Sequence, residues 1–140
     1  MPYQHPTDEV IKDILRSARN VAVVGLSPNP DRPSHDVASY LQKHGYRIIP
    51  VNPTAPEVLG EKSYASLDEI PADISIDVVD VFRRPEDVVP VAEAAIRRGA
   101  KVLWLQEGVV NERAAELAAQ AGLRVVMDRC MLKEHHRLMR

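Results

Sequence analysis

The sequence is poor in cysteine, in aromatic residues and in net charge, and each shortage excludes a class of protein. Cys130 is the only cysteine, so the chain cannot form an internal disulfide. Aromatic residues make up 4% of the chain, too few for the stacking platforms of single-strand nucleic-acid binders. The formal net charge is −2, whereas a general nucleic-acid binder carries a basic stripe. We therefore expect no nucleic-acid partner.

Export signals and long hydrophobic runs are also missing. The N-terminal ten residues contain neither a basic n-region nor an apolar h-region. No apolar run approaches the ~20 residues that span a bilayer. We expect a cytoplasmic protein without membrane contact. With 140 residues, of which 45% are hydrophobic, the chain suits one domain, residues 1–140, that buries a core without a disulfide or metal.

Short apolar segments alternate with segments of helical periodicity along most of the chain. This alternation predicts an α/β fold, a single doubly wound Rossmann-like domain, whose five-stranded parallel sheet has the order 3-2-1-4-5 and helices on both faces. Pro90 is expected to bend its helix or delay the start. The expected strands are 20–25, 46–51, 76–82, 101–105 and 123–127; the expected helices are 7–18, 34–44, 85–98, 111–121 and 131–139, with one short turn at 66–70 in the otherwise irregular segment 52–72.

The loop after the first expected strand has the features of an anion site. A helix that begins near its end presents unpaired N–H groups and about half a positive charge. The loop lacks the Gly-x-Gly-x-x-Gly of NAD sites, because prolines and an arginine stand in place of the glycines. A phosphate site is favoured over the alternative, a rigid turn with a serine N-cap. The candidate residues are Gly25, Leu26, Ser27, Pro28, Arg32, Pro33 and Ser34.

Three further segments are candidates because ligands of open α/β sheets bind beyond the carboxyl ends of the strands. The second strand ends without the carboxylate that holds an NAD ribose, and offers either an apolar shelf for a purine or a plain turn. The third ends in adjacent arginines, which suit a polyanion or are simply solvated. The fourth offers polar groups for a ligand amide and a glycine that lets backbone approach. These residues are Val51, Asn52 and Pro53; Phe82, Arg83 and Arg84; and Gln106, Glu107 and Gly108.

Five segments in order make the chain resemble the coenzyme A-binding domain family, the Rossmann-like domain also found at the start of the succinyl-CoA synthetase alpha subunit. The chain is most similar to the single-domain members. The resemblance implies coenzyme A or an acyl-CoA as ligand. The diphosphate would then bind the 25–34 loop, the adenosine would lie near 51–53, and Phe82 and Arg83 would follow the adenosine or the upper pantetheine arm. Residues 106–108 would line the pantetheine, and Cys130 would lie near its thiol. The matching segments are 24–34, 45–53, 80–83, 102–108 and 128–130.

The resemblance does not extend to the ligase reaction. The ligase relatives have a glycine-rich first loop where this chain has Pro28, Pro30 and Pro33, and we expect no second domain here. We therefore expect a module that binds coenzyme A without catalysis of its own and without catalytic residues. A homodimer or a separate ligase-type subunit would be its partner. The alternative is a small nicotinamide-dependent oxidoreductase or an acyl-CoA-using transferase, although Ser27 has no evident base partner.

Cys130 and the histidines raise two weaker hypotheses. A cysteine between a strand and a helix can have a lowered pKa, so Cys130, helped by Arg129, would form a mixed disulfide with coenzyme A. An inert, part-buried cysteine is the favoured alternative. The histidines lack ligand spacing, and the adjacent His135 and His136 point about 100° apart on a helix, so we expect no metal. The amphipathic C-terminal segment, 132–140, packs on the domain or on a second subunit.

Overall fold

A parallel five-stranded sheet forms the centre of the protein. The computed structural model describes residues 3–139. The sheet order is β2-β1-β5-β6-β7, and every neighbouring pair is parallel. The α/β class and the parallel sheet are therefore confirmed. The strands are β1 (Asn20–Val24), β2 (Arg47–Val51), β5 (Val78–Val81), β6 (Val102–Leu105) and β7 (Arg124–Val126).

When a single parallel bridge is counted as the third strand, β5, β6 and β7 become the fourth, fifth and sixth, and the doubly wound order 3-2-1-4-5 holds for the first five. This bridge joins Val51 of β2 to Tyr64 on the side away from β1. The expected third strand, 76–82, forms β5 instead, and β5 pairs directly with β1. The sequence did not reveal the bridge because one residue is too short to show the period-two pattern of a strand.

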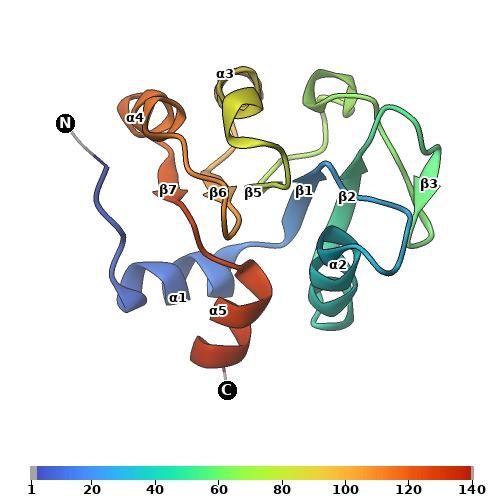
Figure 1. Ribbon diagram of the computed structural model, residues 1–140, viewed down its shortest axis with the longest axis horizontal. Helices are drawn as coiled ribbons and strands as arrows, with labels where there is room; N and C mark the ends of the chain where they lie inside the picture. Colours follow the sequence, from blue (N-terminus) through green and yellow to red (C-terminus); the bar gives the residue numbers. More distant parts are fainter. Residues whose placement is uncertain (1–2, 140) are drawn as a thin grey trace.

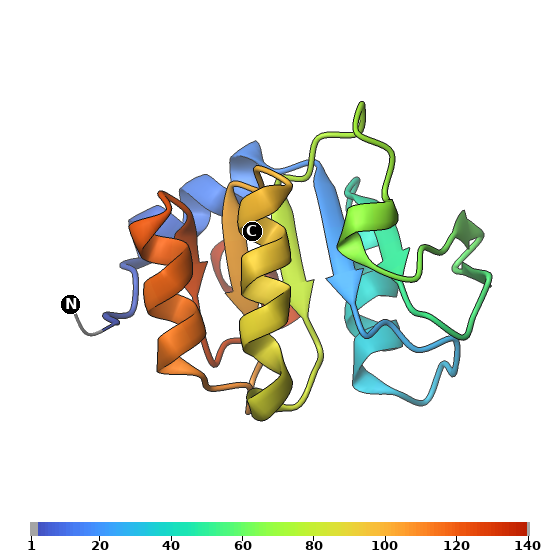
Figure 2. The ribbon, with the colours of Figure 1, turned by 90° about the horizontal axis from the view of Figure 1, so that it is seen from above.

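Helices cover both faces of the sheet, as expected. On one face lie α1 (Asp8–Ser17), α2 (Pro33–Lys43) and α5 (Met131–Leu138); on the other lie α3 (Val88–Arg97), α4 (Glu112–Gln120) and the short 3-10 helix η1 (Leu67–Glu69) (Figure 1). Figure 2 shows α3 and α4 side by side over one face. Each face has its own cluster of buried aliphatic side chains, which accounts for strands that are apolar on both sides.

Local signals set the helix boundaries. The Thr7 hydroxyl accepts a hydrogen bond from the Val10 N–H, and the Asn111 amide oxygen accepts one from the Ala114 N–H, so both residues are N-caps. Pro90 delays the start of its helix: a 3-10 turn, η2 (Pro85–Asp87), comes first, and α3 begins at Val88. The structure thus selects the second of the two effects expected of this proline.

The segment between β2 and β5 contains structure that the sequence did not predict. Two-residue strands, β3 (Glu57–Val58) and β4 (Glu61–Lys62), pair antiparallel around Leu59 and Gly60, which both have positive φ. Such strands are too short to show an alternating pattern. The expected turn at 66–70 is present as η1.

The C-terminal helix packs on the domain itself. Met131 at the start of α5 is fully buried in the cluster that α1 and α2 also line. Near its end the Arg137 guanidinium donates to the carboxylates of Asp8 and Glu134, at 2.9 and 2.5 Å. Within residues 3–139, no helix has the length and apolar character needed to cross a bilayer.

The carboxyl edge of the sheet faces the viewer in Figure 1. There the chain leaves β1 toward α2 on one face of the sheet, whereas it leaves β5 toward α3 on the other face. Because β1 and β5 are neighbours, their connections diverge and leave a crevice between them. This is the position at which open α/β sheets hold their ligands.

Candidate functional site

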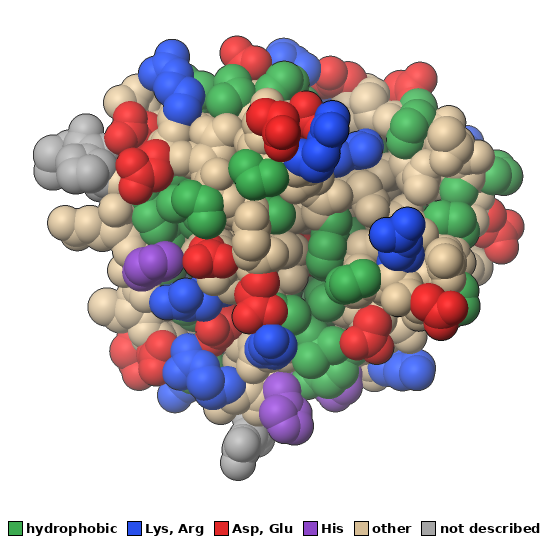
Figure 3. Space-filling view, viewed as in Figure 1, with side chains coloured by type: hydrophobic (Ala, Val, Ile, Leu, Met, Phe, Trp, Pro, Cys, Tyr) green, Lys and Arg blue, Asp and Glu red, His purple; other side chains and the backbone are tan. Residues whose placement is uncertain are grey.

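A cavity of about 720 Å3 occupies this crevice. Its walls come from three of the four segments expected at the carboxyl edge and from Cys130, whereas the 51–53 segment does not line it. Figure 3 shows hydrophobic side chains near the middle of this face with charged side chains around them. A second cavity, of about 570 Å3, lies at the opposite edge of the sheet, away from the strand ends that carry the candidate residues. Candidate residues that line the crevice are Gly25, Ser27, Arg32, Pro33, Ser34, Phe82, Arg83, Arg84, Gln106, Glu107 and Cys130.

Gly25 allows the loop after β1 to lie directly against the end of β5. Its φ is +87°, a left-handed value that favours glycine. A Cβ at this position would overlap the carbonyl oxygen of Phe82 and lie 3.1 Å from its carbonyl carbon. The close approach of these two backbones therefore shapes the floor of the crevice.

Side chains within the 25–34 loop hold its backbone in place. The Ser34 hydroxyl accepts a hydrogen bond from the Ser27 N–H at 3.0 Å, and the Ser27 hydroxyl accepts one from the Asn29 N–H at 3.0 Å. Ser34 lies inside α2, so its interpretation as an N-cap is wrong. The cap residue is Arg32, whose guanidinium has no acceptor for the N–H groups of the helix N-terminus, and Pro33 follows it. The loop is thus preorganised, and the helix end has no internal side-chain cap.

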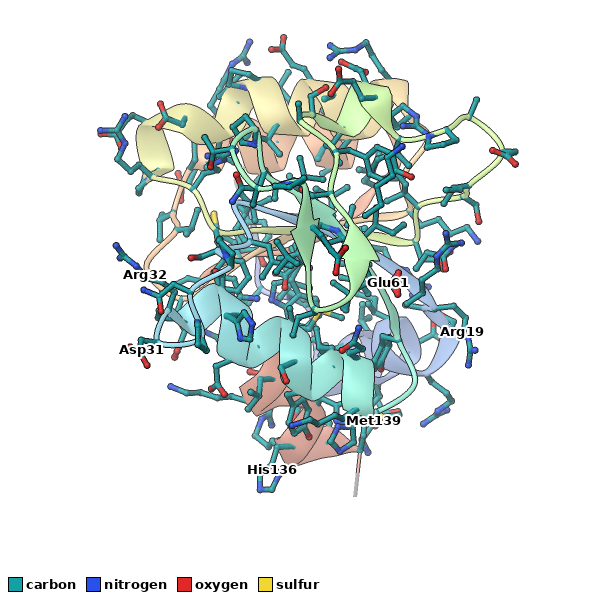
Figure 4. The ribbon with its side chains drawn as sticks, turned by 90° about the vertical axis from the view of Figure 1, so that its right-hand side faces the viewer. Arg19, Asp31, Arg32, Glu61, His136 and Met139 are labelled. Carbon is teal, nitrogen blue, oxygen red and sulfur yellow. The ribbon has the colours of Figure 1, made fainter. Side chains whose placement is uncertain are left out.

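Two of the three arginines around the crevice have no acidic partner among residues 3–139. Arg84 pairs with Asp87 at 3.1 Å. Neither Arg32 nor Arg83 forms an ion pair within the described chain. Figure 4 shows Arg32 at the carboxyl edge, on the opposite side of the molecule from Arg19. The crevice therefore carries uncompensated positive charge.

A buried carboxyl lies beneath the crevice, and sequence reasoning missed it. Asp80 of β5 is fully buried and accepts a hydrogen bond at Oδ1 from Gln106 Nε2 at 2.5 Å. Burial raises the pKa of Asp80 to about 7, although the Gln106 hydrogen bond acts in the opposite direction. A charged residue within an otherwise apolar strand was the signal that could have identified it.

Cys130 lies in the wall of the cavity, but its environment does not activate the thiol. Burial raises the pKa of the thiol, and the charges of Glu107 and Asp80 raise it further. Hydrogen bonds from the Lys133 and Leu132 N–H groups lower it, but by less than burial raises it. The less favoured of the two hypotheses for Cys130, a lowered thiol pKa, is therefore wrong, because desolvation outweighs the strand-to-helix setting. Arg129 is directed to Glu134, at 3.7 Å.

Several candidate residues lie outside the crevice. Leu26 is fully buried, and its carbonyl oxygen accepts from the Asn52 side-chain amide at 2.9 Å. Pro28 and Pro53 are exposed. The Gly108 N–H donates to the Asp128 carboxylate at 2.8 Å. Val37 and Val109 line the crevice and were not expected; both are apolar residues that lie just beyond the candidate segments 25–34 and 106–108.

A smaller cavity, of about 230 Å3, lies near the ends of β1 and β2. Val51 lines it, together with the 65–68 segment and one side of α3 from Pro90 to Arg97. Arg83 lines both this cavity and the crevice, so the two are adjacent at this arginine. An elongated ligand can therefore extend from one to the other past a cationic side chain.

Two of the histidines, His44 and His135, form an aromatic cluster with Tyr40 and Tyr46. Tyr40 stacks on His44 with ring centroids 4.0 Å apart, and its hydroxyl lies 2.9 Å from His135 Nδ1. Burial lowers the pKa of His135, and His44 and His136 lower it further. Within residues 3–139, no three metal-ligating side chains come together.

Comparison with known proteins agrees with this geometry. Residues 19–136 match the family described as the CoA binding domain, so the chain belongs to that family. The resemblance inferred from the sequence is therefore confirmed.

Some relatives match this chain over nearly their whole length, whereas others are ligase subunits that match it over only part of theirs. The uncharacterized protein YneT of Bacillus subtilis is 48% identical over 132 residues, which cover 94% of this chain and 96% of YneT. The solved structure of a hypothetical protein from Pyrococcus horikoshii OT3 matches with a TM-score of 0.92 at 44% identity over 100% of both chains. The alpha subunit of acetate–CoA ligase [ADP-forming] II from Pyrococcus furiosus is 25% identical over 129 residues, covering 85% of this chain and 28% of that subunit.

Proposed function

We propose that the protein binds coenzyme A, free or acylated, in the crevice at the carboxyl edge of its sheet. The observation that carries the proposal is the pair of arginines without acidic partners, Arg32 and Arg83, beside an uncapped helix N-terminus. Coenzyme A has a diphosphate and a 3′-phosphate, which suit a charged rim. Charge-assisted hydrogen bonds to such groups contribute about 1.5–3 kcal/mol each.

The two adjacent cavities, which meet at Arg83, offer separate places for the two parts of this ligand. The 25–34 loop would hold the diphosphate, with Arg32 at its side. The adenosine would lie in the smaller apolar cavity beside Val51, and Arg83 would stand between the two parts. The pantetheine arm would then follow the crevice toward Gln106, Glu107 and Cys130. Val37 and Val109 offer apolar contacts along that path.

The end of β2 supports coenzyme A over a nicotinamide dinucleotide. An NAD site places a carboxylate here for the ribose hydroxyls. This chain has Asn52, whose side-chain amide donates to Leu26 O and whose oxygen accepts from Thr54 N–H at 2.8 Å. The asparagine is therefore engaged in holding two loops together.

The side chains of the crevice favour binding without catalysis. The Ser27 hydroxyl is engaged with the Asn29 N–H, and none of the histidines within residues 3–139 lines the cavity. The Cys130 thiol has a raised pKa, so it is a poor nucleophile at neutral pH. The protein would hold the cofactor or present it to a separate ligase-type subunit, or act as a homodimer.

Isothermal titration calorimetry with coenzyme A, dephospho-coenzyme A and NAD tests the proposal. We expect micromolar affinity for coenzyme A, about −8 kcal/mol. Arg32→Ala and Arg83→Ala should each weaken binding by roughly tenfold or more. Arg19→Ala is the matched control, because it removes the same charge at the opposite edge (Figure 4). Tight binding of NAD with no heat from coenzyme A would refute the proposal.

A further inference from the structure

One buried side-chain atom in the described structure has no hydrogen-bond partner. Within residues 3–139, Oδ2 of Asp80 is the only fully buried side-chain nitrogen or oxygen that has no hydrogen-bond partner. Its neighbours in register on the adjacent strands are Val23 and Trp104, both fully buried, so no side chain beside it in the sheet carries a charge. A buried carboxyl without full hydrogen bonding destabilises a fold, and its presence here calls for a role.

The hydrogen bond from Gln106 to Asp80 determines which end of the Gln106 amide points inward. Its Nε2 donates to Asp80 Oδ1 at 2.5 Å. The amide oxygen, Oε1, receives no hydrogen bond from a described residue, yet it is not among the fully buried unpartnered atoms. Since Gln106 is a buried residue that lines the crevice, this oxygen must be the part that reaches it. Gln106 thus presents an acceptor to the ligand.

We propose that Asp80 is a positioning residue, which holds Gln106 so that its amide oxygen accepts a hydrogen bond from an N–H group of the ligand. The proposal rests on the proposed function and specifies it: the amide-bearing arm of coenzyme A supplies the N–H. A free glutamine amide can present either its oxygen or its NH2 group. The Asp80 carboxyl accepts from the NH2 group and therefore selects the first orientation.

The raised pKa of Asp80 is consistent with this role. At pH 7 the carboxyl is divided between its protonated and ionised forms, and in both forms Oδ1 can accept from Gln106 Nε2. Among the titratable groups of the crevice wall, the Cys130 thiol is affected by the charge of Asp80; its own pKa is raised, so it stays a thiol at this pH. The orientation of Gln106 therefore does not require a charged carboxyl.

Two substitutions at one position separate the acceptor from the charge. Asp80→Leu removes the acceptor at similar volume, and Asp80→Asn retains an oxygen that can accept from Gln106. Binding is measured with coenzyme A and with adenosine 3′,5′-bisphosphate, which has the adenosine, the 3′-phosphate and one of the two 5′-phosphates but no amide arm. We expect Asp80→Leu to weaken coenzyme A binding by roughly tenfold and to leave the bisphosphate within twofold, and Asp80→Asn to leave both within about threefold of wild type.

The outcomes distinguish this inference from the proposed function. If wild-type protein binds neither probe, the proposed function is wrong, and the inference about the amide arm falls with it. If wild type binds coenzyme A but Asp80→Leu binds it equally well, or loses both probes to the same extent, the positioning role alone is wrong.

A measurement on the wild-type protein covers the case in which Asp80→Leu does not fold. In 1H–15N spectra, the side-chain NH2 resonances of Gln106 should shift with coenzyme A and stay in place with adenosine 3′,5′-bisphosphate. Their chemical shifts should also change with pH, with a midpoint near the midpoint of the pH-dependent chemical shift of the Asp80 carboxyl carbon. If these resonances stay unchanged at saturating coenzyme A, Gln106 does not receive the arm and the inference is refuted.

Discussion

The substitution Gly25→Ala tests whether the crevice depends on the close approach of two backbones. Gly25 has a φ of +87°, and an added Cβ would overlap the carbonyl oxygen of Phe82. Gly45 is a matched control: its φ is +94°, but an added Cβ would meet nothing within 4 Å. Both substitutions place alanine in left-handed backbone, whereas only the first also forces two segments apart.

The difference between the two variants measures the cost of separating the segments. A left-handed alanine costs about 1–2 kcal/mol, and overpacking against a backbone adds about 1–3 kcal/mol. We therefore expect Gly45→Ala to lower the free energy of unfolding by about 1 kcal/mol and Gly25→Ala by about 3 kcal/mol. At roughly 3 °C for each kcal/mol, the Tm falls by about 3 °C and about 10 °C.

Urea unfolding followed by circular dichroism gives both free energies, and calorimetry gives the affinity for coenzyme A. Gly25→Ala should also weaken coenzyme A binding by tenfold or more, because the 25–34 loop must move away from Phe82. Gly45→Ala should bind as wild type does, since Gly45 follows α2 at the end far from the crevice. Equal losses of stability in the two variants would refute the argument from close approach.

Three further predictions concern stability. The pKa of Asp80 is raised on folding, from 3.8 to about 7, so the unfolded chain releases its proton first as the pH rises. Wild type should therefore lose stability relative to Asp80→Asn between pH 4 and 7 in urea unfolding at several pH values. A constant difference between the two proteins would contradict the burial effect. The pKa of His135 is lowered on folding, so the contribution of the neutral imidazole to folding stability is full above pH 6.5 and is lost as the pH falls. His135→Gln should therefore make the Tm less dependent on pH between pH 7 and 5. An unchanged pH dependence of the Tm would argue against this effect. The buried Tyr46 hydroxyl donates to the Leu15 carbonyl at 2.5 Å; Tyr46→Phe should cost about 1 kcal/mol in urea unfolding, and no loss would show that water replaces the bond.

Most of the fold could be predicted from local signals. Thr7 and Asn111 cap their helices as their positions indicated, and the five main strands lie within two residues of the expected bounds. Pairings between distant segments were harder, because Tyr64 and the β3–β4 hairpin carry no repeating pattern. The candidate site followed from a rule of topology, which directs attention to strand ends but not to what lies beneath them.

The sequence alone determined the α/β class, most of the helix boundaries, the loop that lines the crevice and the arginines near it. These properties depend on neighbours within a few residues, where periodicity, caps and glycine conformation act. The burial of Asp80, the orientation of Gln106 and the raised pKa of Cys130 depend instead on how strands and helices far apart in the chain exclude water from one another. Because desolvation of a group depends on all the atoms packed around it, these properties could be determined only from the tertiary structure.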